Sequence, residues 1–294
     1  KGDRHHHTVL DAVTTFSRKE RRYVNMARDF KDKVVVITGA ASGLGYALCK
    51  RFAQAGAKVA GLDKDAKGLK TLAEDLSSMG ASANTFVCDV TNETVVNDTI
   101  SQVIDKMGDI YVLINNAGVS HVSLFQKTKA SVLKTVIDIS LFGTIYCTKA
   151  AIDSIIKTQG TVIGVASVAG YAPLAGRTGY AAAKHGMAGF LNTLRTEVDK
   201  TGVKVLLVFA TYIKTNLGKN NLSADGTPMS KERPTSGNVL MPDDVADSIF
   251  HAAAQEERQL MLGETAQASW DLYHSDPVAY EEIMLSLNQF VFEE

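Results

Sequence analysis

Three residues in the second half of the chain have side chains that together could move a proton. Tyr180 and Lys184 stand four positions apart, so a helix would place both on one face. A free tyrosine has a pKa of about 10, and a neighbouring ammonium favours the phenolate and should lower that value. Ser167 precedes Tyr180 at the end of an apolar run, where its hydroxyl could hydrogen-bond a substrate oxygen. The set predicts general acid/base chemistry.

Each of these residues also has an ordinary structural interpretation. Tyr180 would fit a buried aromatic residue, Lys184 a surface lysine and Ser167 a strand end. Taken singly, those interpretations would be preferred. Their spacing, together with a glycine-rich turn earlier in the chain, favours a catalytic site.

The elements that would position these residues alternate regularly from residue 33 onward. Short apolar, β-branched runs predict strands at 33–38, 57–63, 83–89, 109–115, 160–167, 203–209 and 258–263. Helical spacing predicts helices that include 44–56, 130–156 and 243–257, with a C-terminal helix through about residue 290. Near-continuous apolar strands separated by helices indicate a parallel sheet covered on both faces. We expect a doubly wound α/β sheet of about seven strands in three αβα layers.

A glycine-rich turn, "TGAASGLG" at 38–45, joins the first strand to the first helix. Such turns let backbone N–H groups approach a pyrophosphate, and the helix N-terminus adds positive potential. At this place in a βαβ unit, the turn predicts a dinucleotide site. The turn residues expected at the cofactor are Gly39, Ser42, Gly43, Leu44 and Gly45.

An acidic residue, Asp63, ends the second strand. A carboxylate there accepts hydrogen bonds from ribose hydroxyls and repels a 2′-phosphate, so NAD is expected and NADP is less favoured. The alternative role of Asp63 is a strand-end cap.

Five motifs occur in an order that resembles the classical short-chain dehydrogenases/reductases. They are "TGAASGLG" (38–45), "CDV" (88–90), "NNAG" (115–118), "VASVAG" (165–170) and "YAAAK" (180–184), and the similarity covers roughly residues 31–265. The resemblance implies a Rossmann-type fold, a nicotinamide dinucleotide and hydride transfer between an alcohol and a carbonyl. It also implies that Lys184 holds the nicotinamide ribose. Further cofactor contacts implied by the resemblance are Asp89, Val90, Asn116, Ala117, Gly118, Ile213 and Thr215.

Two positions depart from the family pattern. Ser140 stands where the family usually has an asparagine that holds a water beside the catalytic lysine, and it is carried as a fourth candidate catalytic residue. Ala210 and Thr211 replace the usual Pro-Gly after the sixth strand, which removes pre-organisation near the nicotinamide. A dinucleotide-binding sensor or partner protein with little catalysis is therefore a rival to an enzyme.

The amino-acid composition of the chain limits the classes of partner that it is expected to bind. The chain has 294 residues, 45% hydrophobic and 21% charged, as expected for a soluble enzyme with a substantial core. The net charge of −1 favours neither nucleic acid nor an anionic membrane, and no apolar run approaches the roughly 18–20 residues of a membrane span. Cys49, Cys88 and Cys147 lack metal-like spacing and predict reduced thiols in a cytoplasmic protein without a metal site.

The chain is expected to form one dinucleotide-binding domain over 31–294. Residues 1–30, with histidines at 5–7 and Met26 as an alternative start, are expected to be an extension, poorly structured or helical, or an expression remnant. The polar segment 216–241 is expected to be a substrate loop. The residues expected to offer apolar contact are Leu217, Leu222, Met229 and Met241, with 170–176 as another wall.

The leading hypothesis is an NAD(H)-dependent oxidoreductase that interconverts a partly apolar secondary alcohol and a ketone. An NADP-dependent 3-oxoacyl-type reductase is the nearest alternative among enzymes, and Asp63 argues against it. By resemblance to the family, a homodimer or homotetramer is expected, through the long helices after the fourth and fifth strands.

Overall fold

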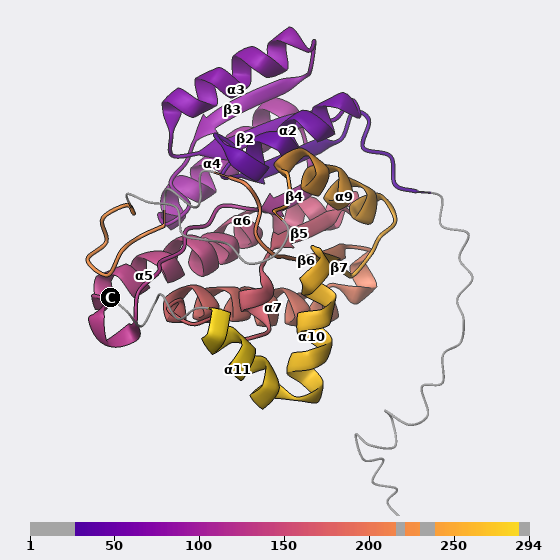
Figure 1. Cartoon of the computed structure of the whole chain (residues 1–294). Coiled ribbons are helices and arrows are strands. Elements are labelled where there is room, and N and C mark those ends of the chain that lie inside the picture. The colour runs from indigo at the N-terminus through magenta and orange to yellow at the C-terminus, as the bar shows by residue number, and fades with distance from the viewer. Residues whose placement is uncertain (1–26, 216–220, 230–238, 288–294) are drawn as a thin grey trace, which may run out of the picture.

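The computed structural model describes residues 27–215, 221–229 and 239–287 (Figure 1). The interpretations made for residues 1–26, including the histidines at 5–7 and a start at Met26, lie outside these residues. So do 216–220 and 230–238 of the expected substrate loop, and 288–294 at the C-terminus.

Seven parallel strands form one sheet in the order β3-β2-β1-β4-β5-β6-β7. The strands are β1 (Val34–Thr38), β2 (Lys58–Asp63), β3 (Ala83–Val87), β4 (Ile110–Asn115), β5 (Thr161–Val165), β6 (Lys204–Ala210) and β7 (Gln259–Leu262). The strand order reverses at β1, which pairs with β2 on one side and with β4 on the other. The carboxyl ends of the strands open a crevice at such a reversal. The predicted doubly wound sheet is confirmed.

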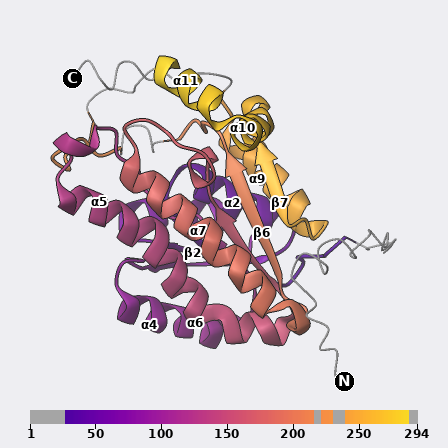
Figure 2. The ribbon, with the colours of Figure 1, turned by 90° about the horizontal axis from the view of Figure 1, so that it is seen from below.

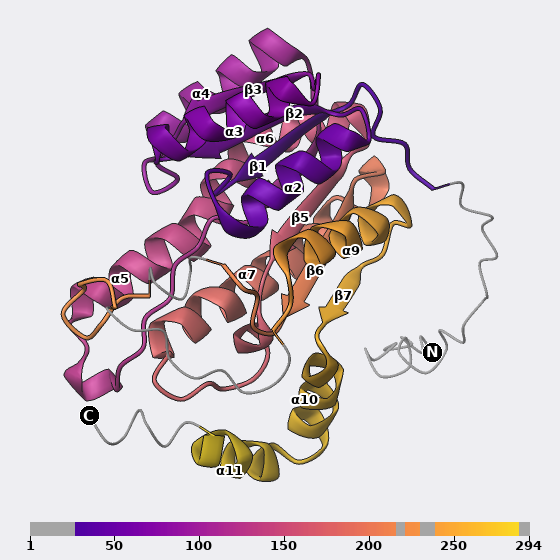
Figure 3. The ribbon, with the colours of Figure 1, turned by 45° about the horizontal axis from the view of Figure 1, so that its top comes forward.

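Helices cover both faces of the sheet. One layer holds α2 (Gly43–Gln54), α3 (Ala66–Ser78) and α9 (Pro242–Ala254), and the other holds α4 (Glu93–Met107), α6 (Gly143–Thr158) and α7 (Thr178–Glu197) (Figures 2 and 3). Side chains of β1 alternate between the two cores, with Val34 and Val36 in one and Val35 and Ile37 in the other. Burial of both faces explains why the strand is apolar at every position.

The helix predicted over 130–156 is interrupted. It consists of α5 (Ala130–Ile137), one π-helical turn (Asp138–Phe142) and α6. A π-turn has no signature in the apolar spacing, so the sequence did not indicate it. Short 3₁₀ turns also occur at Phe125–Lys127, Val168–Gly170 and Asp199–Thr201.

The C-terminal helix is divided in two, α10 (Glu264–Ser275) and α11 (Pro277–Leu287). Asp276 between them is extended, with φ −146° and ψ 83°, as is usual before a proline. The two helices project beyond the carboxyl end of β7 (Figure 3). Trp270 of α10 packs against Tyr171 and Phe209 at ring-centroid distances of 4.9 and 6.1 Å, which holds the pair against the rest of the domain.

The helical segment Ala130–Thr158, which comprises α5, the π-helical turn and α6, is long and apolar enough to cross a membrane by length and composition alone. This finding overturns the expectation that no segment reaches that length. About 33% of its most apolar window is buried. A core helix of a soluble protein can have the same length and composition, so a single such segment is weak evidence for a membrane span.

Candidate active site

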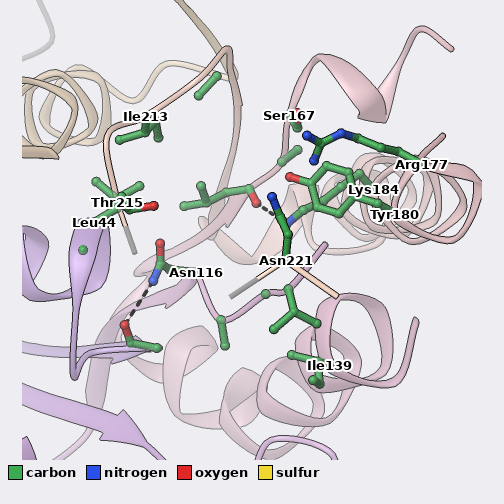
Figure 4. A pocket seen from close by; sticks show the side chains of 18 of the residues that line it. Leu44, Asn116, Ile139, Ser167, Arg177, Tyr180, Lys184, Ile213, Thr215 and Asn221 are labelled. Carbon is green, nitrogen blue, oxygen red and sulfur yellow. Dashed lines mark hydrogen bonds between the residues drawn. The ribbon is translucent and has the colours of Figure 1, made fainter. Parts of the chain in front are cut away.

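A cavity of about 730 Å³ opens at the carboxyl ends of the strands, where the sheet order reverses (Figure 4). Every predicted site residue except Gly45 and Ser140 lines it. The turn at 38–45, the loop after β4, the end of β5 and the start of α7 all reach this cavity. The parallel sheet brings them together because the carboxyl ends of its strands share one edge.

The glycine-rich turn has the geometry of an anion cradle. Gly39 has φ +69°, which favours glycine. A Cβ on Gly45 would lie 2.0 Å from the Gly39 carbonyl oxygen, so Gly45 supports the turn from beneath although it does not line the cavity. Ser42, at the N-cap of α2, makes no side-chain capping hydrogen bond. The first N–H groups of α2 can therefore bind an anion such as a pyrophosphate, and the turn fits a dinucleotide.

The loop after β4 is tied to the end of β1. The Thr38 hydroxyl oxygen accepts hydrogen bonds from the backbone N–H groups of Asn116 and Ala117, both at 3.0 Å. The Asn116 side-chain amide donates to the Thr38 carbonyl oxygen at 2.9 Å. These bonds hold the "NNAG" loop against the glycine-rich turn, where both line one side of the cavity.

Asp63 lies at the cavity and also caps its own turn. Its two carboxylate oxygens accept backbone N–H hydrogen bonds from Ala41 and Asp65, each at 3.0 Å. The capping interpretation and the cofactor interpretation are therefore compatible. Asp89 and Val90 line the cavity nearby, and the Asp89 carboxylate accepts hydrogen bonds from the N–H and hydroxyl of Thr91.

Ser167, Tyr180 and Lys184 meet on one wall of the cavity (Figure 4). The Ser167 hydroxyl lies close enough to Tyr180 to lower the pKa of the phenol. The Lys184 Nζ lies 5.7 Å from the centroid of the Tyr180 ring and donates to the Val165 carbonyl oxygen at 2.7 Å. Both α7 residues are buried, at 9% and 3% exposure.

Burial dominates the electrostatics of this wall. Burial raises the pKa of Tyr180 above its usual value, while the Ser167 hydroxyl and the charge of Arg177 oppose that shift. Burial also lowers the pKa of Lys184 to about 8. The sequence led us to expect a lowered pKa for Tyr180. The neighbouring side chains alone do not produce it, because the effect of desolvation on this pKa is larger than theirs.

Ser140, the fourth candidate catalytic residue, does not line the cavity. It is fully buried in the π-turn and lies behind the cavity wall. Its hydroxyl is 3.4 Å from both the N and the O of Val119. Gly118 lies between Ser140 and Lys184, because a Cβ there would be 3.4 Å from the serine oxygen and 3.6 Å from the lysine nitrogen. This arrangement favours a role for Ser140 in fixing the loop.

Ala210 and Thr211 continue the sheet in place of a Pro-Gly bend. Ala210 is paired with Leu262 of β7, and the Thr211 N–H donates to the Leu262 carbonyl oxygen at 3.0 Å. Ile213 then forms a parallel bridge with Leu240. Strand pairing thus directs the chain so that both Ile213 and Thr215 still line the cavity.

Several cavity residues had no signal in the sequence. Among the loop residues expected to contact a substrate, Leu217 lies outside the described residues, and Leu222, Met229 and Met241 do not line the cavity, whereas Leu174 of the predicted 170–176 wall does. Additional lining residues include Arg177, Asn221, Thr265, Ser269, Tyr280 and Met284. Four of these come from α10 and α11, and the packing of Trp270 against Tyr171 and Phe209 holds α10 at the cavity.

A buried histidine beside this wall was also missed. His121 is 0% exposed, and its Nε2 accepts the backbone N–H of Gly179 at 2.9 Å. Gly179 immediately precedes Tyr180. Burial, with a smaller effect of the Arg177 charge, lowers the pKa of His121 to about 4, so the ring is neutral at physiological pH.

The chain is similar in sequence to known proteins over most of its length. The sequence model of the family described as "short chain dehydrogenase" matches residues 33–226. Dehydrogenase/reductase SDR family member 7B of Xenopus tropicalis is 33% identical over 239 residues, which are 79% of this chain and 77% of the relative. Dehydrogenase/reductase SDR family protein 7-like of Anopheles gambiae is 33% identical over 290 residues, covering 94% and 88%.

Solved structures share the fold. A short chain dehydrogenase/reductase from Burkholderia phymatum, in complex with NAD, has a TM-score of 0.77 at 24% identity and covers 85% of this chain and 95% of its own. An alcohol dehydrogenase from the archaeon Thermococcus sibiricus, complexed with 5-hydroxy-NADP, has a TM-score of 0.70 at 22% identity, with coverages of 80% and 97%. At these identities the likeness establishes the architecture.

Proposed function

The chain belongs to the short-chain dehydrogenase/reductase family, and from this premise we propose that it is an NAD(H)-dependent oxidoreductase interconverting a secondary alcohol and a ketone. The observation that carries the proposal is the meeting of Ser167, Tyr180 and Lys184 on one wall of the cavity that begins at the glycine-rich turn. A nicotinamide dinucleotide, when bound, supplies or accepts the hydride.

In this proposal Tyr180 transfers the proton at the substrate oxygen. Its hydroxyl donates a proton during ketone reduction and its phenolate accepts one during alcohol oxidation. Ser167 hydrogen-bonds the same oxygen and stabilises the charge that develops there. Lys184, held by the Val165 carbonyl, supplies positive charge beside the ring and a donor for the nicotinamide ribose. Burial excludes water, which strengthens each of these interactions.

Support for NAD over NADP comes from Asp63. Its carboxylate lines the cavity at the end of β2, where it accepts two backbone hydrogen bonds and is held in place. A fixed negative charge there repels a 2′-phosphate and accepts hydrogen bonds from ribose hydroxyls. The remaining proposed cofactor contacts are the predicted cofactor residues that line the cavity, from Gly39 in the glycine-rich turn to Thr215 after β6.

Substitution Tyr180→Phe tests the catalytic role. The variant keeps the ring but loses the proton, so kcat should fall at least about 100-fold while the Kd for NADH stays within twofold. Turnover can be followed by NADH absorbance across a panel of ketones. Unchanged turnover in the variant would refute the oxidoreductase assignment and favour a nucleotide-binding sensor.

We further propose a cytoplasmic homodimer or homotetramer. The exposed parts of the long helical segment 130–158 and of α7 offer the surface for self-association. Light scattering of the purified chain, with fractionation of cells that express it, tests both statements. A monomer in solution, or recovery of the chain in the membrane fraction, would contradict them.

A further inference from the structure

The residue at the N-cap of the helix that carries Tyr180 cannot cap that helix. It is Arg177, whose guanidinium has only donors and cannot accept a helix N–H. The first bond of the helix runs from the Ala181 N–H to the Arg177 carbonyl oxygen at 2.8 Å, so the N–H groups of 178–180 precede the intrahelical ladder. Gly179 and Tyr180 are buried. A buried N–H without an acceptor costs free energy, so the start of α7 depends on an acceptor from another segment.

The imidazole of His121 supplies an acceptor at this place. Its Nε2 accepts the Gly179 N–H at 2.9 Å, across 58 positions of the chain. Gly179 is the second residue of α7, and the N–H at that position is one that an N-cap side chain commonly binds. A Cβ on Gly179 would lie 3.2 Å from this nitrogen and 2.9 Å from the Leu133 Cδ2, so glycine leaves room for the ring. A histidine distant in sequence thus caps the helix of Tyr180.

The hydrogen bonds on the other side of the ring determine which nitrogen carries the proton. His121 Nδ1 lies 3.4 Å from the Ser123 hydroxyl oxygen, which lies 2.7 Å from that of Thr128. The Thr128 hydroxyl donates to the Leu124 carbonyl oxygen at 2.7 Å, and a carbonyl can only accept. Ser123 therefore donates to Thr128 and accepts from Nδ1–H. The opposite end requires the same arrangement, because the Gly179 N–H can only donate and needs a bare Nε2.

The backbone beside His121 is fixed on both sides. His121 forms a parallel bridge with Leu222, which packs against the apolar cluster that contains Tyr180. The Ser123 N–H donates to the Gly176 carbonyl oxygen at 2.9 Å, just before α7 begins. The ring is therefore held at the start of α7 by contacts other than the bond that it accepts, and it is pre-organised as an acceptor.

We propose that His121 is a positioning residue for the reaction, which caps α7 at Gly179 and so fixes the Tyr180 hydroxyl at the substrate oxygen. This proposal rests on the proposed function, because Tyr180 is the group through which His121 acts. The imidazole itself is 0% exposed and is not among the described residues that line the cavity, so it does not touch the substrate. A small displacement of Tyr180 would lower kcat, because proton transfer depends on close alignment.

Two substitutions of His121 separate the two ends of the ring. The amide of His121→Gln reaches the place of Nε2 and can accept the Gly179 N–H, whereas the shorter His121→Asn reaches only the place of Nδ1, beside Ser123. In ketone reduction, His121→Asn should lower kcat at least about tenfold with KM within about threefold. His121→Gln should stay within about threefold of the wild type in both constants. The same two changes at His251, an exposed position of α9, should leave both constants unchanged.

The kinetic results can overturn the proposal in several ways. An equal kcat in His121→Asn and the wild type would show that the cap does not position Tyr180. An equal loss in His121→Gln and His121→Asn would assign the effect to the lost ring volume. A rise in KM alone, or a Kd for NADH weakened about tenfold, would assign His121 to ligand binding. Thermal unfolding shows whether the variants are folded.

A measurement on the wild type keeps the proposal testable if neither variant folds. NMR of the imidazole nitrogens near neutral pH should show that the His121 proton is on Nδ1 and that Nε2 is bare. A proton on Nε2 would overturn the proposal, because that nitrogen could not then accept the Gly179 N–H.

Amide hydrogen exchange distinguishes this proposal from the proposed function, because it needs no turnover. In the NADH complex, exchange of residues 177–184 should be about tenfold faster in His121→Asn, as expected for the loss of one cap, and unchanged in His121→Gln. If this result is obtained and no ketone is reduced, His121 still fixes the start of α7 and only the proposed reaction fails. Equal exchange in His121→Asn and the wild type would overturn the role of His121 whatever the turnover.

Discussion

The buried imidazole of His121 should make the stability of the fold depend on pH. Its Nε2 accepts the Gly179 N–H at 2.9 Å, and its Nδ1 lies 3.4 Å from the Ser123 hydroxyl. Protonation would put a hydrogen on Nε2, facing the N–H that it now accepts. Burial lowers the pKa to about 4, whereas in the unfolded chain the imidazole takes up the proton near its ordinary pKa of 6.5.

The sign and size of the effect follow from proton linkage. Between these two pKa values the unfolded state binds the proton and the folded state does not, so the stability is fully present above pH 6.5 and is lost as the pH falls toward 4. From pH 7.5 to pH 5 the loss from this one group is about 2 kcal/mol. Below pH 4 it levels off at roughly 3 kcal/mol.

The substitution His121→Gln isolates this contribution. Glutamine does not titrate, and its side-chain oxygen can accept the Gly179 N–H. Urea unfolding at pH 7.5, 6 and 5 should show the wild type losing about 2 kcal/mol more than the variant across this range. His185→Gln, which removes an exposed imidazole from α7, should follow the wild type. Parallel curves for the wild type and His121→Gln would refute the reasoning.

Three further substitutions test other parts of the structure. Asp63→Asn removes the charge that opposes a 2′-phosphate. When both cofactors are titrated, the ratio of the Kd for NADP to the Kd for NAD should fall about tenfold. An unchanged ratio would contradict the proposed role of the Asp63 charge. Gly45→Ala would place a Cβ 2.0 Å from a turn carbonyl oxygen and should weaken NADH binding at least about tenfold, whereas Gly189→Ala, with open space around its Cβ, should not. Arg28→Ala breaks a 2.7 Å ion pair with Glu256, whose two side chains are 11% and 22% exposed. The free energy of unfolding measured with urea should fall by about 1–3 kcal/mol. An unchanged free energy of unfolding would show that the ion pair contributes nothing to stability.

The local chemistry of the chain was readable from residue types and spacing. Tyr180 and Lys184 share a face of α7 because any helix places positions four apart together. The strand β1 was recognisable because both of its faces are buried, which requires apolar side chains at every position. The turn after β1 was recognisable because only glycine tolerates the φ of Gly39 and the close approach at Gly45.

The electrostatics of the site needed the tertiary structure. A nearby lysine suggests a lowered tyrosine pKa, yet burial raises that of Tyr180 and lowers that of Lys184. The degree of burial is set by every element that packs over the residue, and no local pattern encodes it. The position of Ser140 behind the cavity wall likewise depends on the π-turn.

By itself, then, the sequence determined the alternation of strands and helices, the dinucleotide turn and the order of the motifs, because these depend on backbone sterics and on the periodicity of burial. Only the tertiary structure decided that α10 and α11 contribute to the cavity lining and that Asn221 presents an unpartnered acceptor there. Those features arise from contacts between segments far apart in the chain, where the partner of each side chain is fixed by packing.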